Sequence, residues 1–152
     1  MKPDGGIVFL ISLDGGTFPI LIAEAKNQGT NDLRKQEGKP LQARGNAIER
    51  LGKNVIGFRT AMLPEAILPF VCFGYGDDFN EKSSILDRVT TIAMFGRLNT
   101  TNLFNTGACS RFNRGSFYFR EKIWSDEEMR KIMLDIASRS IQYYFSKPKF
   151  LI

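Results

Sequence analysis

Two apolar runs near the start of the chain predict a β-hairpin. They extend from Ile7 to Ser12 and from Thr17 to Ala23, and the turn residues Asp-Gly-Gly at 14–16 separate them. Asp-Gly between two β-rich runs is the strongest short signal for a tight hairpin turn. The first strand carries apolar side chains on both of its faces, so both faces need packing partners.

Charged residues continue the second strand directly after its apolar run. Glu24 and Lys26 are two positions apart and therefore share one face of the strand. A turn centred near Gly15 pairs residues whose numbers sum to about 28 or 29, which places Asp4 opposite Glu24 or Ala25. The hairpin therefore predicts that Asp4, Glu24 and Lys26 gather at its open end.

Helices and strands alternate through the rest of the chain, as expected for an α/β domain. Steps of three and four predict a helix over about 46–62, with an apolar stripe of Ile48, Leu51, Val55, Phe58 and Met62. The runs at 68–73 and 115–119 predict strands, the first of them central and buried. A second helix is expected from Ser84, and a third follows the capping box of Ser125 and Glu128. No boundary divides the 152 residues, so one domain over 1–152 is expected.

The composition restricts the possible chemistry. There is no histidine, which excludes hydrolases that depend on a histidine base and most zinc enzymes. The net charge of +5 favours an anionic partner only weakly. Cys72 and Cys109 lack metal-ligand spacing, and no signal peptide or membrane-spanning run is visible. A cytoplasmic protein whose chemistry uses carboxylates, lysine and a hard cation is expected.

Asp4, Glu24 and Lys26 suit metal-assisted phosphodiester hydrolysis. Two converging carboxylates can hold Mg²⁺, which takes few protein oxygens and keeps several waters. A lysine beside the metal can lower the pKa of an attacking water or stabilise negative charge on a phosphate. The competing interpretation is an ordinary solvated strand end, where charged residues are common.

The start of the helix at 46 carries a second candidate site. Asn46 and Arg50 are four apart on its polar face, together with position 53 or 54. Asn pairs bidentately with adenine and Arg is the commonest base-reading side chain, so this helix start could enter a major groove. The alternative is a solvated face on which Glu49 and Lys53 form an i, i+4 pair.

Together these residues resemble the EcoRI family of type II restriction endonucleases. The resemblance rests on "KPDGGIV", on "LIAEAKNQG" and above all on "GNAIER" at 45–50 followed by "KN". It continues in "LPFVCF", "ILDRVTTIAMFG" and "IWSDEEMRKIMLDIASRS", so it covers nearly the whole chain. Many nucleases share the PD…ExK signature, whereas an intact GNAIER at this distance behind it is specific. The resemblance implies the PD-(D/E)xK restriction-endonuclease fold, a central mixed sheet flanked by helices.

Site residues follow from the resemblance position by position. Asp4 and Glu24 match the metal-binding carboxylates, the carbonyl of Ala25 matches a further ligand, and Lys26 matches the catalytic lysine. The segment from Gln42 to Arg50 matches the part that reads the inner AATT of a palindrome. The matching DNA-contacting positions are Gln28, Asn46, Ala47, Arg50 and Arg88. Glu49 matches a residue that links the two recognition helices across a homodimer.

The resemblance implies Mg²⁺-dependent cleavage of double-stranded DNA, at GAATTC or a similar site, in a restriction–modification system with a cognate methyltransferase. Two alternatives are a truncated DNA-binding remnant without activity and a PD-(D/E)xK nuclease of DNA repair. The chain departs from the pattern at Ile85, where the family has an arginine, and at Asn27, which follows the catalytic lysine. It also begins two residues before Pro3, where the family has a long N-terminal segment. We therefore expect a marginally stable, aggregation-prone and poorly active chain.

Overall fold

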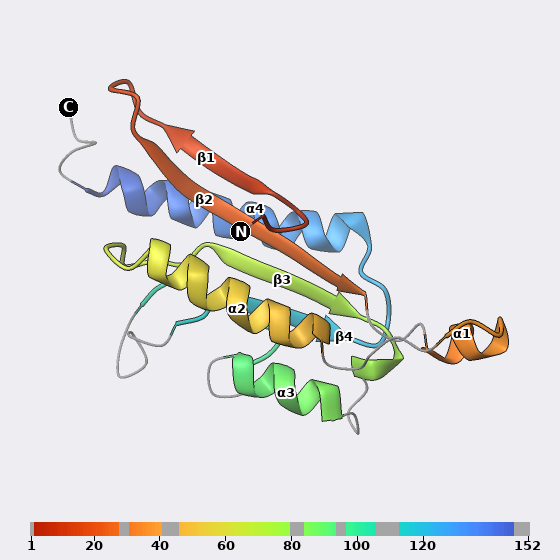
Figure 1. Ribbon diagram of the computed structural model, residues 1–152. Helices are drawn as coiled ribbons and strands as arrows, with labels where there is room; N and C mark the ends of the chain where they lie inside the picture. Colours follow the sequence, from red (N-terminus) through yellow and green to blue (C-terminus); the bar gives the residue numbers. More distant parts are fainter. Residues whose placement is uncertain are drawn as a thin grey trace.

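A mixed four-stranded sheet lies at the centre of the structure, a computed structural model that describes residues 2–27, 31–40, 46–79, 84–93, 97–105 and 113–147. The strand order is β1-β2-β3-β4 (Figure 1). β1 is antiparallel to β2, whereas β2, β3 and β4 run parallel. The strands are β1 (Ile7–Ile11), β2 (Thr17–Asn27), β3 (Phe70–Tyr75) and β4 (Ser116–Arg120). The predicted α/β class is confirmed, and one domain over 1–152 stays a prediction.

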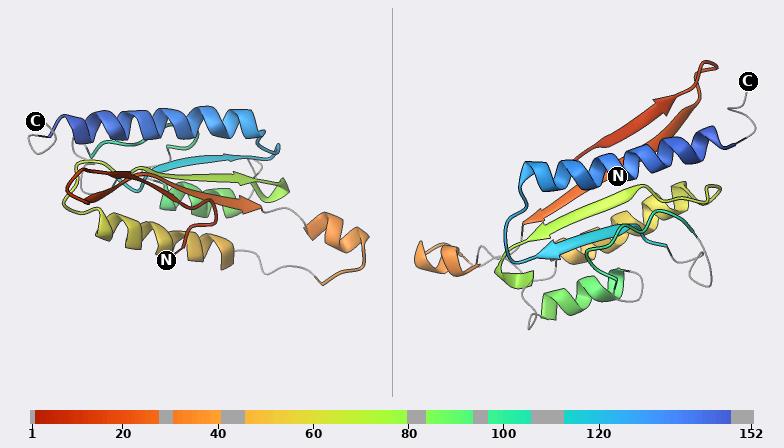
Figure 2. Two further views of the ribbon diagram at one scale, coloured as in Figure 1. Left: turned by 90° about the horizontal axis from the view of Figure 1, so that it is seen from above. Right: turned by 180° about the vertical axis from the view of Figure 1, so that it is seen from behind.

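Helices cover both faces of this sheet. α4 lies along one face, and α2 and α3 lie on the other, while α1 projects beyond the ends of the strands (Figure 2). Their bounds are α1 (Asn31–Gln36), α2 (Asn46–Ala61), α3 (Ser84–Ile92) and α4 (Asp126–Phe145), and a short 3₁₀ helix η1 spans Asp77–Phe79. Because α2 and α3 each follow a parallel strand, they begin near the edge of the sheet where those strands end. Ligands of open α/β sheets bind at that edge.

The hairpin has the register expected from its turn. Ile7 pairs with Ile22 and Ile11 pairs with Thr17. A register shift between Val8 and Phe9 inserts one extra residue on β2. Ile7 and Leu10, which the alternation expected for β1 places on opposite faces, both pack against the core. The register beyond the bulge still carries Asp4 toward the end of β2.

The predicted stripe of α2 packs against the sheet. Ile48, Leu51, Val55, Phe58 and Met62 are all buried, as the spacing predicted. Phe58 stacks on Phe70 of β3 with ring centroids 5.6 Å apart. This packing fixes the position of α2 against the face of the sheet on which Glu24 lies.

The capping box predicted at the start of α4 is present. Ser125 accepts a hydrogen bond from the backbone of Glu128, whose carboxylate accepts one from the backbone of Ser125. Arg120, at the end of β4, donates to both Glu128 oxygens at 2.9 and 2.6 Å. These bonds, first those of Arg120 and then those of Ser125, lower the pKa of Glu128 to about 2. The cap therefore joins α4 to the central sheet.

The edge strand β1 presents exposed apolar side chains. Val8, Phe9 and Ile11 are each about half exposed or more, and Leu13 in the turn is almost fully exposed. Within the described residues, β1 pairs only with β2, so its outer backbone groups have no neighbouring strand. Exposed, apolar edge strands are templates for intermolecular strand pairing.

Replacing Phe9 by lysine should reduce aggregation of the protein. Phe9 is 47% exposed, so its loss costs little packing, while a charge on an edge strand opposes pairing with another chain. Light scattering against protein concentration measures the effect, and a thermal melt checks that the fold is retained. Replacing exposed Leu134 of α4 by lysine is the matched control. Equal scattering for the Phe9 variant and the unchanged protein would show that β1 does not drive association.

Candidate active site at the end of the hairpin

Asp4, Glu24 and Lys26 lie together, as the hairpin register predicted. The Lys26 Nζ is 2.5 Å from Oε1 of Glu24 and 3.1 Å from Oδ2 of Asp4. Because both contact the same ammonium group, the two carboxylates lie close together. Their exposure differs greatly: the side chain of Glu24 is 1% exposed, that of Lys26 14% and that of Asp4 67%. The cluster therefore reaches from a buried carboxylate to one in contact with solvent.

The backbone of β2 explains this convergence. Ala23 accepts a hydrogen bond from the amide of Gly5 at 2.9 Å and donates one to the carbonyl of Gly6 at 3.0 Å. These two bonds fix the segment carrying Asp4 alongside β2. Backbone groups two residues apart in a strand point the same way, so the carbonyl of Ala25 also points toward the side on which Asp4 lies.

The buried Glu24 has a second partner from α2. The side-chain amide of Asn54 donates to Glu24 Oε1 at 3.2 Å and to Oε2 at 3.3 Å. Charged groups are almost never fully buried unless they are paired and hydrogen-bonded. Lys26 and Asn54 together meet this requirement. Helical periodicity put position 53 or 54 on the polar face, one turn beyond Arg50, but it did not indicate Glu24 as the partner of Asn54.

Lys26 is held in its charged form. Burial lowers the pKa of Lys26, but hydrogen bonds to Glu24 and then to Asp4, with the charges of both carboxylates, outweigh it. The net pKa is raised above the ordinary value of 10.5, so the ammonium is protonated at neutral pH. The stabilisation that this pairing gives the fold is present at neutral pH and lost only as the pH rises through the raised pKa.

The oxygen donors of this cluster fit a magnesium ion. The carboxylates of Asp4 and Glu24 both contact the Lys26 ammonium and so lie close together. The carbonyl of Ala25 is directed toward the side of β2 on which Asp4 lies. Mg²⁺ is usually bound by one or two carboxylates and keeps several waters, so this set is sufficient. No group of three or more His, Cys, Asp or Glu side chains with metal-binding geometry occurs in the described part of the chain.

Three of the expected DNA-reading residues, Asn46, Ala47 and Arg50, belong to the first turns of α2. Asn46 and Ala47 belong to its first turn, but their side chains are outside the described set, as is the whole of Gln28. Glu49 and Arg50 are described and exposed. The positive end of the helix dipole lies at the same turn and favours negative charge such as a phosphate. This end of α2 therefore presents groups suited to nucleic acid.

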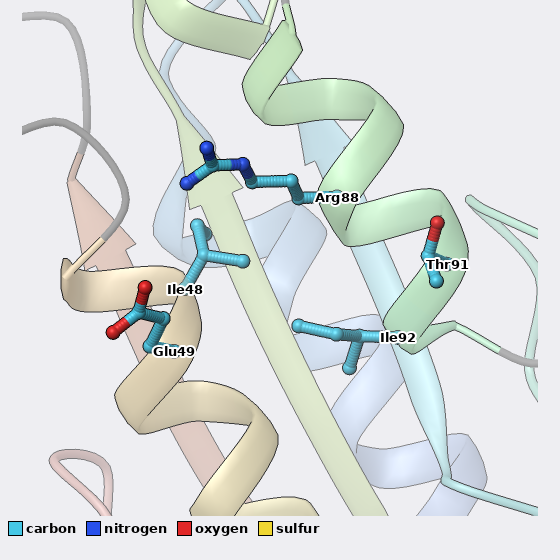
Figure 3. A pocket seen from close by; sticks show the side chains of 5 residues that line it. All are labelled: Ile48, Glu49, Arg88, Thr91 and Ile92. Atoms are coloured by element: carbon cyan, nitrogen blue, oxygen red, sulfur yellow. The ribbon is translucent and has the colours of Figure 1, made fainter.

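A pocket of about 320 Å³ separates the start of α2 from α3. Arg88 extends from α3 toward α2 above Ile48, and Glu49 lies on the opposite wall (Figure 3). Thr91 and Ile92 complete the lining. Arg88 and Glu49, for which the resemblance implies a DNA contact and a dimer contact, thus line one pocket. Ile85, where the resemblance implies an arginine, is 3% exposed and belongs to the core. Arg88 is the exposed cationic residue among the described side chains of α3.

Cys72 lies beside Glu24 in the sheet, directly opposite it on β3. Burial, and then the negative charge of Glu24, raise the pKa of this thiol well above its ordinary value. A thiol reacts as its thiolate, so Cys72 should be inert in the folded protein. Alkylation by iodoacetamide in a Cys109→Ser background, followed by mass spectrometry, tests this. We expect modification only in denaturant, and rapid modification under native conditions would show that the interior around Glu24 opens.

No helix in the described ranges is long and apolar enough to cross a membrane.

Comparison with known proteins identifies the family. A model of the restriction endonuclease EcoRI family matches residues 1–85 and 82–150. The type II restriction enzyme RsrI of Cereibacter sphaeroides is 31% identical over 176 aligned positions, which cover 93% of this chain and 63% of RsrI. The type II restriction enzyme EcoRI of Escherichia coli is 34% identical over 123 positions, which cover 75% of this chain and 42% of EcoRI. The chain thus spans less than two thirds of the length of either relative.

The matches include the segments that form the site described above. The first matched range contains the hairpin with Asp4, Glu24 and Lys26 and the helix that begins with Asn46. The second contains α3, β4 and α4. The mixed sheet with helices on both faces agrees with the fold that the motifs predicted. The chain belongs to the EcoRI family of restriction endonucleases.

Proposed function

We propose that the protein is a type II restriction endonuclease that hydrolyses double-stranded DNA with Mg²⁺ as its cofactor. The observation that carries the proposal is the convergence of Asp4 and Glu24 on Lys26 at the end of the hairpin. Family membership supports it, because both relatives are type II restriction enzymes. The proposed setting is the cytoplasm, in a restriction–modification system with a methyltransferase that protects the same DNA site.

The roles of the three residues follow from their chemistry. When bound, a magnesium ion would supply Lewis-acid polarisation of the scissile phosphate and activation of water. Asp4, Glu24 and the carbonyl of Ala25 would hold the cation. Lys26, protonated at neutral pH, contributes a fixed positive charge beside the attacking water or the phosphate oxygens, where negative charge grows during hydrolysis. Burial of Glu24 strengthens these interactions, because water screens them less.

Recognition of the DNA is assigned to the start of α2 and to α3. Arg50 is exposed on α2, and Arg88 extends from α3 toward it. We place Asn46, Ala47 and Arg50 against the inner base pairs of a palindrome with an AATT centre, Arg88 near the outer pair, and Gln28 near the scissile phosphate. A palindrome requires two equivalent reading surfaces, so the proposed assembly is a homodimer, with Glu49 linking the two recognition helices.

Digestion of a plasmid that carries one GAATTC sequence tests the proposed activity. We expect full-length linear DNA in Mg²⁺ and intact plasmid in EDTA, while Ca²⁺ supports binding without cleavage. A plasmid without the sequence is the control for non-specific nuclease. Sequence-specific binding without cleavage in Mg²⁺ would identify an inactive DNA-binding remnant, and cleavage without sequence preference would favour a repair nuclease.

Replacing Arg50 by alanine should reduce discrimination at one inner base pair by about 1–3 kcal/mol, the usual contribution of a good base contact. Replacing Lys53, which is exposed one turn further along α2, should weaken binding to all duplexes equally. If Lys53 contacts a phosphate, its loss should also reduce the salt dependence by about one released counterion. Binding measured in Ca²⁺ against matched and scrambled duplexes separates the two effects. Equal affinity of the unchanged protein for both duplexes would contradict direct base reading by α2.

A further inference from the structure

We propose that Asn54 is a positioning residue, which orients the Glu24 carboxylate for metal binding. The proposal rests on the proposed function, since it concerns the same metal site. It assigns to a side chain in the middle of α2 a role that none of the sequence motifs indicates.

The hydrogen bonds of Glu24 carry this inference. Lys26 contacts Oε1, whereas the Asn54 amide reaches both Oε1 and Oε2, at 3.2 and 3.3 Å. In the described part of the chain, the hydrogen bond to Oε2 comes from Asn54. A carboxylate held by one donor can still rotate about its terminal bond, whereas two donors on different elements, Lys26 on β2 and Asn54 on α2, together restrict that rotation. Asn54 therefore helps to set the orientation in which Glu24 presents its oxygens beside Asp4.

The surroundings make Asn54 a rigid support. Leu51, Val55 and Phe58 bury α2 against the sheet on both sides of Asn54 along the helix. Glu24 is itself 2% exposed in the middle of a paired strand, opposite Cys72. Both partners are thus held by regular structure. Groups that hydrogen-bond to a metal-binding carboxylate typically change metal affinity or activity by about 10–100-fold when they are removed.

Substitutions at Asn54 separate positioning from a merely structural role. Asn54→Leu removes the hydrogen-bond donor at a similar side-chain volume. Asn54→Ala removes the donor and adds no bulk, so it replaces the leucine variant if that variant fails to fold. Asn54→Gln keeps an amide donor on a longer side chain. Thr60→Ala, an exposed change two turns along the same helix, is the matched control.

Mn²⁺ binding by the full chain without DNA, measured by electron paramagnetic resonance, is the decisive readout. We expect Asn54→Leu and Asn54→Ala to weaken Mn²⁺ binding about tenfold or more, Asn54→Gln to recover part of it, and Thr60→Ala to leave it unchanged. DNA affinity in EDTA should stay within about twofold in all variants, while the single-turnover cleavage rate falls with Mn²⁺ affinity. A role confined to structure would instead lower the melting temperature without changing the Mn²⁺ affinity of the folded protein.

The outcomes distinguish this inference from the proposed function. If the unchanged protein binds Mn²⁺ and cleaves DNA, and the Asn54 variants do so equally well, the positioning role is wrong and the nuclease assignment stands. If the unchanged protein neither binds Mn²⁺ nor cleaves DNA, the proposed function fails and the role of Asn54 fails with it. Weakened Mn²⁺ binding in folded variants with normal DNA affinity supports both.

Discussion

Replacing Asp4 by asparagine is expected to lower the rate of DNA cleavage by about a thousandfold or more, while the fold remains as stable as before. The carboxylate is 67% exposed, so its neutralisation removes little packing. It is also one of two carboxylates that converge on Lys26, so its loss removes a proposed metal ligand and the associated stabilisation of the transition state. Single-turnover cleavage and a thermal melt measure the two effects separately.

Companion variants define the origin of this loss. Glu24→Gln and Lys26→Ala should reduce cleavage similarly, but they also lower stability. Lys26→Ala leaves the buried Glu24 carboxylate without this counter-charge, and Glu24→Gln leaves Lys26 paired with the exposed Asp4. Asp135→Asn removes an exposed carboxylate of α4 that pairs with Arg139, and should leave cleavage unchanged. Cleavage by the Asp4 variant at the unchanged rate would remove Asp4 from the active site and leave the cluster a solvated strand end.

Replacing Gly74 by alanine is expected to destabilise the fold by about 1–3 kcal/mol or more, the usual cost of overpacking a core. A Cβ at this position would lie 2.2 Å from two ring carbons of Phe119. Phe119 is 2% exposed and packs edge-on against Phe79, so the ring cannot move into solvent. The Gly74 carbonyl also accepts the indole hydrogen bond of Trp124, which holds the backbone of β3 in place. Urea denaturation measures the change in the free energy of unfolding.

Two further variants test the explanation. Phe119→Ala costs stability by itself, but it provides the space that Gly74→Ala requires, so the double variant should be more stable than the sum of the two effects predicts. Gly52→Ala is the matched control: its Cβ would meet Ile92 at an ordinary 3.6 Å inside α2. That change should be neutral or stabilising by up to about 1 kcal/mol, since alanine favours helix. Additive effects of Gly74→Ala and Phe119→Ala would contradict the steric account.

Much of the fold follows from local sequence signals. The Asp-Gly turn fixes the register of the hairpin, and the register alone brings Asp4 to Lys26. The apolar stripe predicts both the extent of α2 and the residues it buries. The capping box predicts the start of α4. In each case, residues close in sequence determine the outcome, so no knowledge of tertiary packing is needed.

Features that depend on contacts between distant segments were not predictable. β2 continues to Asn27, four residues beyond its apolar run, because Lys26 and Asn54 compensate the buried charge of Glu24. The Asn54 contact crosses thirty positions of the chain and needs the packing of α2 on the sheet. The pocket between α2 and α3 likewise exists only once both helices are placed. Helix α1 has too few residues for an apolar stripe to form, so no pattern indicated it.

Sequencing the ends produced from a library of randomised duplexes tests whether this protein cuts DNA at one sequence by means of Lys26. The duplexes are incubated in Mg²⁺ with the unchanged protein and, in parallel, with Lys26→Ala. We expect the unchanged protein to produce ends at one palindrome with an AATT centre, and the Lys26 variant to produce none above background. Ends scattered over all sequences, or equal in number for the two proteins, would contradict this expectation.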